Sequence, residues 1–227
     1  MAPIAIAARI RGACTAALLW LGAPLIAQAQ GGAKPQGQAV TGKDLLAERS
    51  KGSLRAPIVV YEMSDFQCPY CRQHSVDVFP VLERSYIGTG KVRWVFINFP
   101  LTSVHANAAA AAELALCAAH QGKFWPLHDL IFKYQETWAP LREPGPFLLS
   151  LADSAGVPHQ PMETCLTSAA TRDELKADAE GAQRSGAQST PTFYIDGGLL
   201  VGAQPIEVWK QVLDSIYKAK KSVTGKR

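Results

Sequence analysis

The sequence predicts a mixed α/β fold, in which a small sheet with helices on both faces is interrupted by a block of helices. Apolar stretches with the composition of strands occur in two groups, one before and one after the middle of the chain, each accompanied by helical patterns. Residues 101–167, between the two groups, contain helical patterns with no strand among them. These two observations predict one sheet built from both groups, with a helical insertion.

Length and composition are those of a single globular domain. The chain has 227 residues, of which 48% are hydrophobic, 19% charged and 8% aromatic, and this apolar fraction excludes intrinsic disorder. The net charge of +4 comes without a dense basic block, so we expect no binding to nucleic acid. Beyond the N-terminus, the sequence has no apolar run long enough to span a membrane.

The N-terminus has the three parts of an export signal. Two arginines precede an apolar stretch at residues 13–27, and the small-residue motif A-Q-A at 27–29 is a cleavage site. A membrane anchor is the alternative, but it needs about 20 apolar residues and this run is shorter. We therefore expect residues 1–29 to be a cleaved signal peptide, residues 30–55 to be a flexible lead-in, and the protein to be periplasmic.

The first group of elements reads as strand, helix, strand. Residues 57–63 are β-branched and apolar with few polar positions, which is typical of a buried central strand. A helix is predicted from about Cys68 to Tyr86, and Pro80 is expected to kink it or end it early. Residues 91–97 predict a second strand, and the helix between the two is long enough for a parallel crossover.

The insertion and the second group complete the pattern. Residues 106–119 are rich in alanine, a strong helix former, and further helices are expected within 124–134 and 147–155. A polar helix is predicted over 168–187. It is followed by two short strands around an Asp-Gly-Gly turn and by a final amphipathic helix at about 206–216.

A pair of cysteines, Cys68-Pro69-Tyr70-Cys71, stands where the first strand meets the start of a helix. The first helical turn offers unpaired backbone N–H groups and the positive end of the helix dipole, which stabilise a thiolate at Cys68. A lowered thiol pKa makes this sulfur a nucleophile and a good leaving group near neutral pH. Pro69 fits the first turn, where its missing N–H is not needed. Cys71 is one turn further on, where it can close a small disulfide ring and resolve a mixed disulfide.

Other uses of this cysteine pair stay open on the residues alone. It could be half of a zinc site, although no second Cys-x-x-Cys pair or His-x-His cluster is present to complete four ligands. His74 and His105 could in principle contribute. The pair could be a structural disulfide, although so short a loop gains little entropic stabilisation. A haem attachment site is excluded, because Arg72 stands where the histidine is required. The five histidines of the chain are expected on helix surfaces or in loops, without a role.

Four segments, in order, resemble the DsbA-like family of thiol-disulfide oxidoreductases, which have a thioredoxin fold. They are Glu62–Cys71 around the cysteine pair, Gln121–Trp125 after a helix that contains Cys117, Ser189–Phe193, and Gly202–Pro205 before the last helix. The likeness covers roughly residues 56–217, which is nearly all of the chain that follows the predicted signal peptide.

The resemblance implies a division of the chain into parts. A thioredoxin-like domain comprises residues 56–100 and 168–220, and a helical insertion comprises residues 101–167. Residues 221–227 are expected to be a C-terminal tail.

The resemblance also implies roles for residues outside the cysteine motif. Glu62 stands where thioredoxin-fold proteins commonly keep a buried acid, whose raised pKa would let it exchange protons with Cys71. The alternative is a solvated glutamate, because alternation along a strand cannot fix its face. Thr190-Pro191 matches the family's cis-proline segment, whereas an X-Pro bond is otherwise usually trans. A cis bond would expose the Thr190 backbone to a substrate strand beside Cys68.

Cys117 and Cys165 are expected to form a second disulfide, because the surroundings of an exported protein are oxidising and because family members provide the precedent. The alternative is two buried free thiols, since free cysteine packs as a small hydrophobe. The bond would close a long loop across the helical insertion.

The function implied by the resemblance is that of an exported oxidant. It would donate its Cys68–Cys71 disulfide to reduced or unfolded exported proteins and be reoxidised by a quinone-linked membrane protein. No metal or cofactor is implied, and a monomer is expected. Two alternatives remain, a disulfide isomerase or reductase and a non-catalytic peptide-binding chaperone. The isomerase relatives dimerise through a separate N-terminal domain, for which the residues before the first strand are too few.

Overall fold

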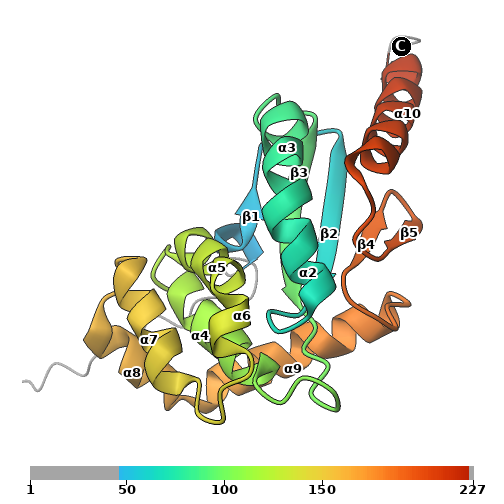
Figure 1. Ribbon diagram of the computed structural model, residues 1–227. Coiled ribbons are helices and arrows are strands. Elements are labelled where there is room, and N and C mark those ends of the chain that lie inside the picture. The colour runs from blue at the N-terminus through green and yellow to red at the C-terminus, as the bar shows by residue number, and fades with distance from the viewer. Residues whose placement is uncertain (1–45, 225–227) are drawn as a thin grey trace, which may run out of the picture. The chain divides into compact units, whose positions relative to one another are not determined.

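The computed structural model describes residues 46–224 (Figure 1). Within these residues, five strands form one mixed sheet in the order β1-β3-β2-β4-β5. Strands β2 and β3 are parallel, and the other neighbours are antiparallel. The strands are β1 (Ser50–Lys51), β2 (Ile58–Ser64), β3 (Val92–Asn98), β4 (Thr192–Ile195) and β5 (Gly198–Val201).

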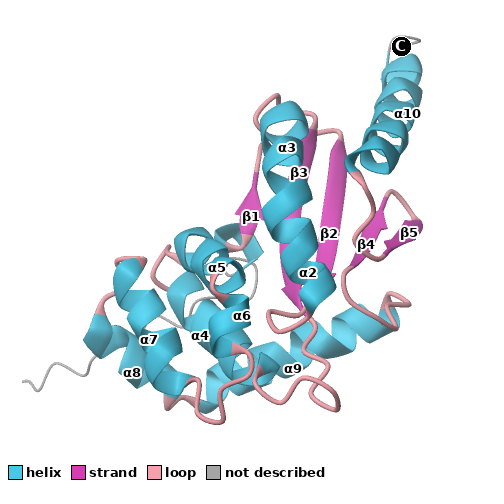
Figure 2. Cartoon of the chain, in the orientation of Figure 1, coloured by secondary structure: helices cyan, strands magenta, loops and turns pink. Residues whose placement is uncertain are grey.

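Helices flank this sheet and form a separate block beside it. In Figure 2, α2 and α3 run along one face of β2 and β3, and α4 to α8 gather beside the sheet. The helices are α2 (Pro69–Gln73), α3 (Phe79–Leu82), α4 (Ala108–Ala119), α5 (Phe124–Lys133), α6 (Gln135–Trp138), α7 (Gly145–Ser154), α8 (His159–Leu166), α9 (Ala169–Arg184) and α10 (Ile206–Thr224). None of these described helices is long and apolar enough to cross a membrane.

The sheet begins earlier in the chain than the sequence predicts. Ser50–Lys51 form the edge strand β1, antiparallel to β3, although the sequence assigns residues 30–55 to a flexible lead-in. Arg49, beside this strand, is 2% exposed and forms ion pairs with Glu174 and Asp178 of α9. The lead-in assignment is therefore wrong from Arg49 onward, because distant carboxylates hold this arginine in the interior. The signal peptide predicted at residues 1–29 lies outside the described residues.

The helix that follows the cysteine pair does not end at Pro80. The helical segment continues to Ile87 through two wider, π-helical turns, His74–Val78 and Glu83–Ile87. Pro80 lies between them, in the first turn of α3. A π-helical turn shifts the backbone hydrogen bonds by one residue, which accommodates the missing N–H of proline inside a helix.

The last helix is longer than expected. The sequence assigns residues 221–227 to a tail, but α10 continues through Thr224, so the tail assignment is wrong for residues 221–224. No glycine or proline stands between Ile206 and Thr224, and the first helix-breaking residue in the sequence is Gly225.

The hydrophobic core has two large parts, and the cysteine pair belongs to one of them. The first part lies between the sheet, α3 and α10, and includes Trp94 and Trp209. The second fills the helical block and extends to Cys68, Cys71 and Phe96. The helical insertion therefore packs directly against the cysteine motif.

Cys117 of α4 and Cys165 of α8 form a disulfide, with their Cα atoms 5.7 Å apart. Replacing both by alanine is expected to lower the free energy of unfolding by on the order of 4 kcal/mol, because the bond closes a loop of 48 residues in the unfolded chain. Thiol–disulfide exchange at Cys68 should change little, because the bond lies within the helical block. Urea unfolding of the variant and of the wild-type protein measures the loss. An unchanged midpoint, or two alkylatable thiols at these positions in the unreduced protein, would contradict the prediction.

Candidate active site

Cys68 stands at the N-terminus of α2, where the chain leaves β2. Its backbone is extended, with φ −71° and ψ 124°, and Pro69 occupies the first turn of the helix. No side chain caps this helix end, so the first backbone N–H groups are free to face the Cys68 sulfur. On the other side, the Cys68 thiol donates a hydrogen bond to the Thr190 carbonyl, with the sulfur 3.4 Å from the oxygen.

These surroundings lower the pKa of the Cys68 thiol to about 6. The largest cause is a hydrogen bond from the Cys71 thiol. Burial opposes it, while the Thr190 side chain and the backbone N–H groups of Cys71 and Tyr70 act in the same direction. Cys68 therefore carries a thiolate near neutral pH, although the residue is only 4% exposed.

Cys71 has the opposite character. It is fully buried, and its sulfur accepts a hydrogen bond from the backbone N–H of Asp65 at 3.4 Å. Burial, and then the neighbouring Cys68, raise the pKa of this thiol well above its usual range. Both cysteines are reduced in this structure, so one sulfur is poised as a thiolate and the other as a protonated thiol.

Glu62 is buried on the central strand β2. Trp94 Nε1 donates to its Oε2 at 2.8 Å, whereas Oε1 accepts no hydrogen bond of normal geometry within the described structure. Burial raises the pKa of this carboxyl, against the charge of His128 and the Trp94 hydrogen bond. The hydroxyl of the buried Ser64 lowers the pKa of both Glu62 and Cys71. The alternative of a solvated glutamate is therefore wrong, because Glu62 is 2% exposed.

Thr190 and Pro191 form the opposite wall of the site. The peptide bond between them is cis, and Thr190 is 7% exposed. The Thr190 hydroxyl has no other hydrogen-bond partner of normal geometry among the described residues, so it is free to donate to a thiolate at Cys68. The Pro191 carbonyl accepts a hydrogen bond from the backbone N–H of Gly202 at 2.8 Å, which ties this loop to the end of β5.

The helical insertion contributes one side chain that sequence reasoning missed. Gln135 of α6 is 3% exposed and donates hydrogen bonds to the carbonyls of Phe66 at 2.7 Å and Cys68 at 2.9 Å. These two carbonyls belong to the loop between β2 and α2, so Gln135 fixes that loop from the insertion side. No local pattern marks this glutamine, because its partners are 67 and 69 residues away in the sequence.

The loop between β2 and α2 is also held by one of its own residues, Asp65; these contacts are called the Asp65 clamp below. The buried Asp65 carboxylate accepts hydrogen bonds from the backbone N–H of Gln67 at 2.7 Å and of Leu101 at 2.8 Å, and it pairs with His105 Nδ1 at 2.8 Å. Because the Asp65 backbone N–H also bonds Cys71, the Asp65 clamp sets the position of the buried sulfur.

The structure gives no support to a zinc site at the cysteine pair. No group of three or more His, Cys, Asp or Glu side chains within residues 46–224 could hold a metal ion. His105 bonds Asp65, and His74 lies among aromatic rings. His74 and His128 are 0% and 1% exposed, so the expectation that every histidine lies on a surface or in a loop is wrong for these two.

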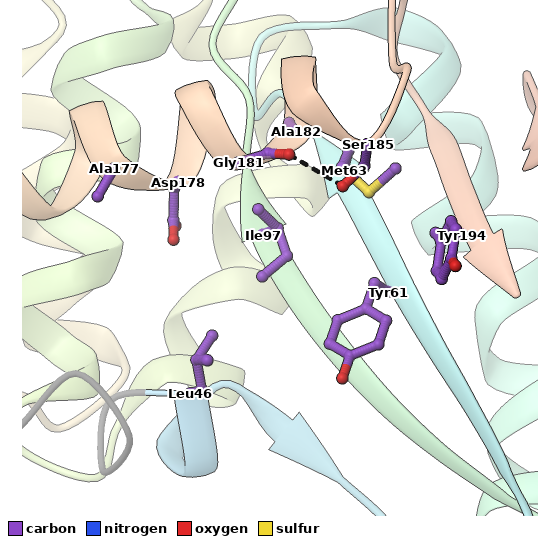
Figure 3. A pocket seen from close by; sticks show the side chains of 10 residues that line it. All are labelled: Leu46, Tyr61, Met63, Ile97, Ala177, Asp178, Gly181, Ala182, Ser185 and Tyr194. Atoms are coloured by element: carbon purple, nitrogen blue, oxygen red, sulfur yellow. Dashed lines mark hydrogen bonds between the residues drawn. The ribbon is translucent and has the colours of Figure 1, made fainter. Parts of the chain in front are cut away.

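A cleft of about 440 Å³ lies between the sheet and α9 (Figure 3). Tyr61 and Met63 of β2 line it, together with Tyr194 of β4 and residues of α9. Side chains alternate along a strand, so Tyr61 and Met63 face away from Glu62. The cleft is therefore on the sheet face opposite Glu62 and is not part of the cysteine site.

Comparisons with known proteins agree with this geometry. The family model described as Thioredoxin matches residues 45–215. The probable disulfide bond formation protein D of Bacillus anthracis is 32% identical over 158 residues, which are 67% of this chain and 71% of that protein. The Na(+)/H(+) antiporter NhaA 3 of Salinispora tropica is 32% identical over 167 residues, which are 74% of this chain. The chain spans only 24% of the length of that antiporter.

A solved structure shows the same fold. Alpha-DsbA1 of Wolbachia pipientis superposes with a TM-score of 0.70 at 22% identity, covering 78% of this chain and 94% of that one. At this identity the likeness concerns the fold alone, a thioredoxin-like sheet with inserted helices. With the family model and the Bacillus relative, it leads to one conclusion: the chain belongs to the DsbA-like family of thiol-disulfide oxidoreductases, built on a thioredoxin fold with an inserted helical subdomain.

Proposed function

We propose that the protein is an exported oxidant that donates its Cys68–Cys71 disulfide to reduced or unfolded exported proteins. The observation that carries the proposal is the opposite character of the two sulfurs. The surroundings lower the pKa of Cys68 and raise that of Cys71. A sulfur that is stable as a thiolate is a good leaving group, and a disulfide that releases it is easily reduced and therefore oxidising.

The chemical steps follow from these properties. A substrate thiolate attacks Cys68 Sγ, a bond forms between the two sulfurs, and the Cys68–Cys71 bond breaks with its electron pair on Cys71. Because the raised pKa of Cys71 favours the thiol, the leaving sulfur takes a proton, which we assign to the buried Glu62 carboxyl. A second substrate thiolate then attacks the substrate's own sulfur and releases Cys68 as a thiolate. The substrate gains a disulfide, and the protein is left with a thiolate and a thiol.

The proposed substrate is an extended peptide segment that pairs with the backbone of Thr190. Support comes from the position of this residue, whose carbonyl lies 3.4 Å from Cys68 Sγ. Tyr70, inside the cysteine motif, is 63% exposed and offers an apolar contact beside the reacting sulfur. Backbone pairing fits an enzyme that must accept many sequences, because main-chain hydrogen bonds do not depend on the side chains of the substrate.

The wider setting is part of the same proposal. The predicted signal peptide would place the protein in the periplasm, where a quinone-linked membrane protein would reoxidise it and where it would act as a monomer. Membership of the DsbA-like family supports export and reoxidation. The lowered pKa of Cys68 favours an oxidant over a reductant or isomerase, and a non-catalytic chaperone would not require it.

Oxidation of a model peptide tests the proposal. The oxidised protein is mixed in equal amount with a peptide that carries two thiols, without any other oxidant. We expect the peptide to gain a disulfide while Cys68 and Cys71 become alkylatable, as followed by mass spectrometry. Protein that has been reduced and then alkylated is the control. A peptide that stays reduced, together with rapid reshuffling of a scrambled substrate, would favour the isomerase instead.

A further inference from the structure

Glu62 lies between two aromatic residues, and each of them contacts a buried histidine. Its partners in the sheet register are Phe96 on β3 and Phe193 on β4. The His128 ring meets the Phe96 ring edge-on, with centroids 5.1 Å apart, and the His74 ring lies 4.6 Å from the Phe193 ring. The carboxyl that we assign as a proton donor is thus close to two imidazoles in the core.

The two histidines differ in their connection to solvent. His74 has no hydrogen-bond partner for either ring nitrogen among the described residues, and burial, with the charge of His128, lowers its pKa to about 3. The His74 ring therefore stays neutral and has no contact with solvent. His128 is 1% exposed, but its Nδ1 lies 2.8 Å from Oδ1 of Asp129, whose side chain is 61% exposed. Only the second of these imidazoles reaches from the core to the surface.

Burying the imidazole of His128 costs free energy, because its surroundings are apolar. Its neighbours are aromatic rings, those of Phe66, Phe79, Phe96, Phe124, Trp125 and Phe132. Nε2 is buried without a hydrogen-bond partner in the described structure. A buried polar atom without a partner costs free energy, and no hydrogen bond in the described structure holds Nε2 back from exchanging a proton inside the core.

Electrostatic interactions connect Glu62, His128 and Asp129, which together lead from the core to the surface. The charge of His128 lowers the pKa of Glu62, in keeping with the packing of Phe96, the cross-strand neighbour of Glu62, against the His128 ring. Partial burial raises the pKa of Asp129, but the hydrogen bond and charge of His128, with Lys51, bring it below its usual value. Lys51 is itself paired with Glu83. Asp129 therefore stays ionised and holds the proton of His128 on Nδ1, which leaves Nε2 to face the interior.

We propose that His128 is the group through which the buried Glu62 exchanges its proton with solvent, and that Asp129 is its positioning residue. The inference rests on the proposed role of Glu62. When the Cys68–Cys71 bond is reduced, Glu62 gives a proton to Cys71 and becomes a carboxylate. His128, when it carries a proton on both ring nitrogens, gives the Nε2 proton to Glu62 and keeps the Nδ1 proton that Asp129 accepts. The neutral ring then returns to the doubly protonated form by taking up one proton from solvent. One proton enters the protein for each disulfide that becomes a thiolate and a thiol.

The test is the rate at which dithiothreitol reduces the oxidised full-length protein, followed by stopped-flow tryptophan fluorescence over a range of pH. His128→Phe is expected to slow this reaction about tenfold at neutral pH. Glu62→Gln should slow it at least as much, and the double variant should be no slower than Glu62→Gln, because both groups act in one path. Asp129→Asn should give a smaller loss and a shifted pH profile. His74→Phe, the matched buried histidine, should leave the rate unchanged.

Each result separates a proton path from a packing role. A His128→Phe variant with the wild-type rate and pH profile would overturn the inference, and so would losses that multiply in the double variant. If His128→Phe does not fold, His128→Gln keeps a polar side chain that cannot relay a proton, and the same slowing is expected of it. A wild-type rate for Glu62→Gln would refute the role of Glu62 and this inference with it. If the peptide oxidation assay fails, the proposed function as an oxidant is refuted. The rates of reduction by dithiothreitol still test the proton path, because they do not depend on a protein substrate.

Discussion

Cys68→Ser is expected to abolish thiol–disulfide exchange, whereas Cys71→Ser is expected to accumulate mixed disulfides with substrates. Cys68 is the sulfur with the lowered pKa at a helix N-terminus, and Cys71 is fully buried. Without Cys68 the protein lacks the sulfur that forms the bond with the substrate, because the remaining Cys71 is 0% exposed. Without Cys71 the bond between Cys68 and the substrate has no resolving thiol inside the protein, so it persists until an external thiol cleaves it.

Non-reducing electrophoresis and mass spectrometry of the two variants, each incubated with a reduced substrate peptide and a mild oxidant, measure this difference. The matched control is Cys117→Ala with Cys165→Ala, which removes the other cysteines of the described structure while leaving the reacting pair. Adducts that form on Cys68→Ser and not on Cys71→Ser would show that the two roles are reversed.

The elements that the sequence predicts are those with strong local patterns. The apolar run of β2, the alanine-rich α4 and the Asp-Gly-Gly turn before β5 are each specified by neighbouring residues, and the structure has all three. The polar segment of α8 carries no such pattern, and the sequence does not predict this helix. Helices of this kind are stabilised by tertiary packing, here through Met162 and the Cys117–Cys165 disulfide.

The residues of the candidate site also fall into two groups, those that local sequence predicts and those that it does not. The cysteine motif is contiguous, so its position at a helix start can be predicted from local sequence alone. Gln135 and Arg49 cannot be found in this way, because their partners are more than 40 residues away and a glutamine or an arginine is most often exposed. Burial of His128 is equally hidden, since its aromatic neighbours come from separate segments of the chain.

The redox potential of the Cys68–Cys71 pair is expected to lie above the roughly −270 mV of thioredoxin and nearer to about −120 mV. The full interval corresponds to about five orders of magnitude in the equilibrium with substrate thiols, at roughly 30 mV per factor of ten. The physical reason is the lowered pKa of Cys68, because each group that donates to its thiolate stabilises the reduced protein. Equilibration with glutathione buffers, followed by alkylation of the free thiols, measures the potential.

The same thiolate makes the stability of the reduced protein depend on pH. The folded-state pKa of Cys68 is about 6, below the ordinary value of 9.0, so its stabilising contribution is complete above about pH 9 and is lost as the pH falls through about 6. The raised pKa of Cys71 acts only at higher pH, where it begins to destabilise the reduced form. The unfolding temperature of the reduced protein, relative to the oxidised protein, should therefore rise between about pH 6 and pH 9.

Thr190→Val is the matched control for both measurements, because it removes the free hydroxyl while keeping the shape of the side chain and the carbonyl that faces Cys68. We expect this variant to have a higher pKa at Cys68, a lower potential and a weaker dependence of stability on pH. A wild-type potential near −270 mV, or an unfolding difference that does not change between about pH 6 and pH 9, would show that the surroundings of Cys68 do not favour its thiolate. The protein would then be a reductant, and the direction of electron flow proposed for it would be reversed.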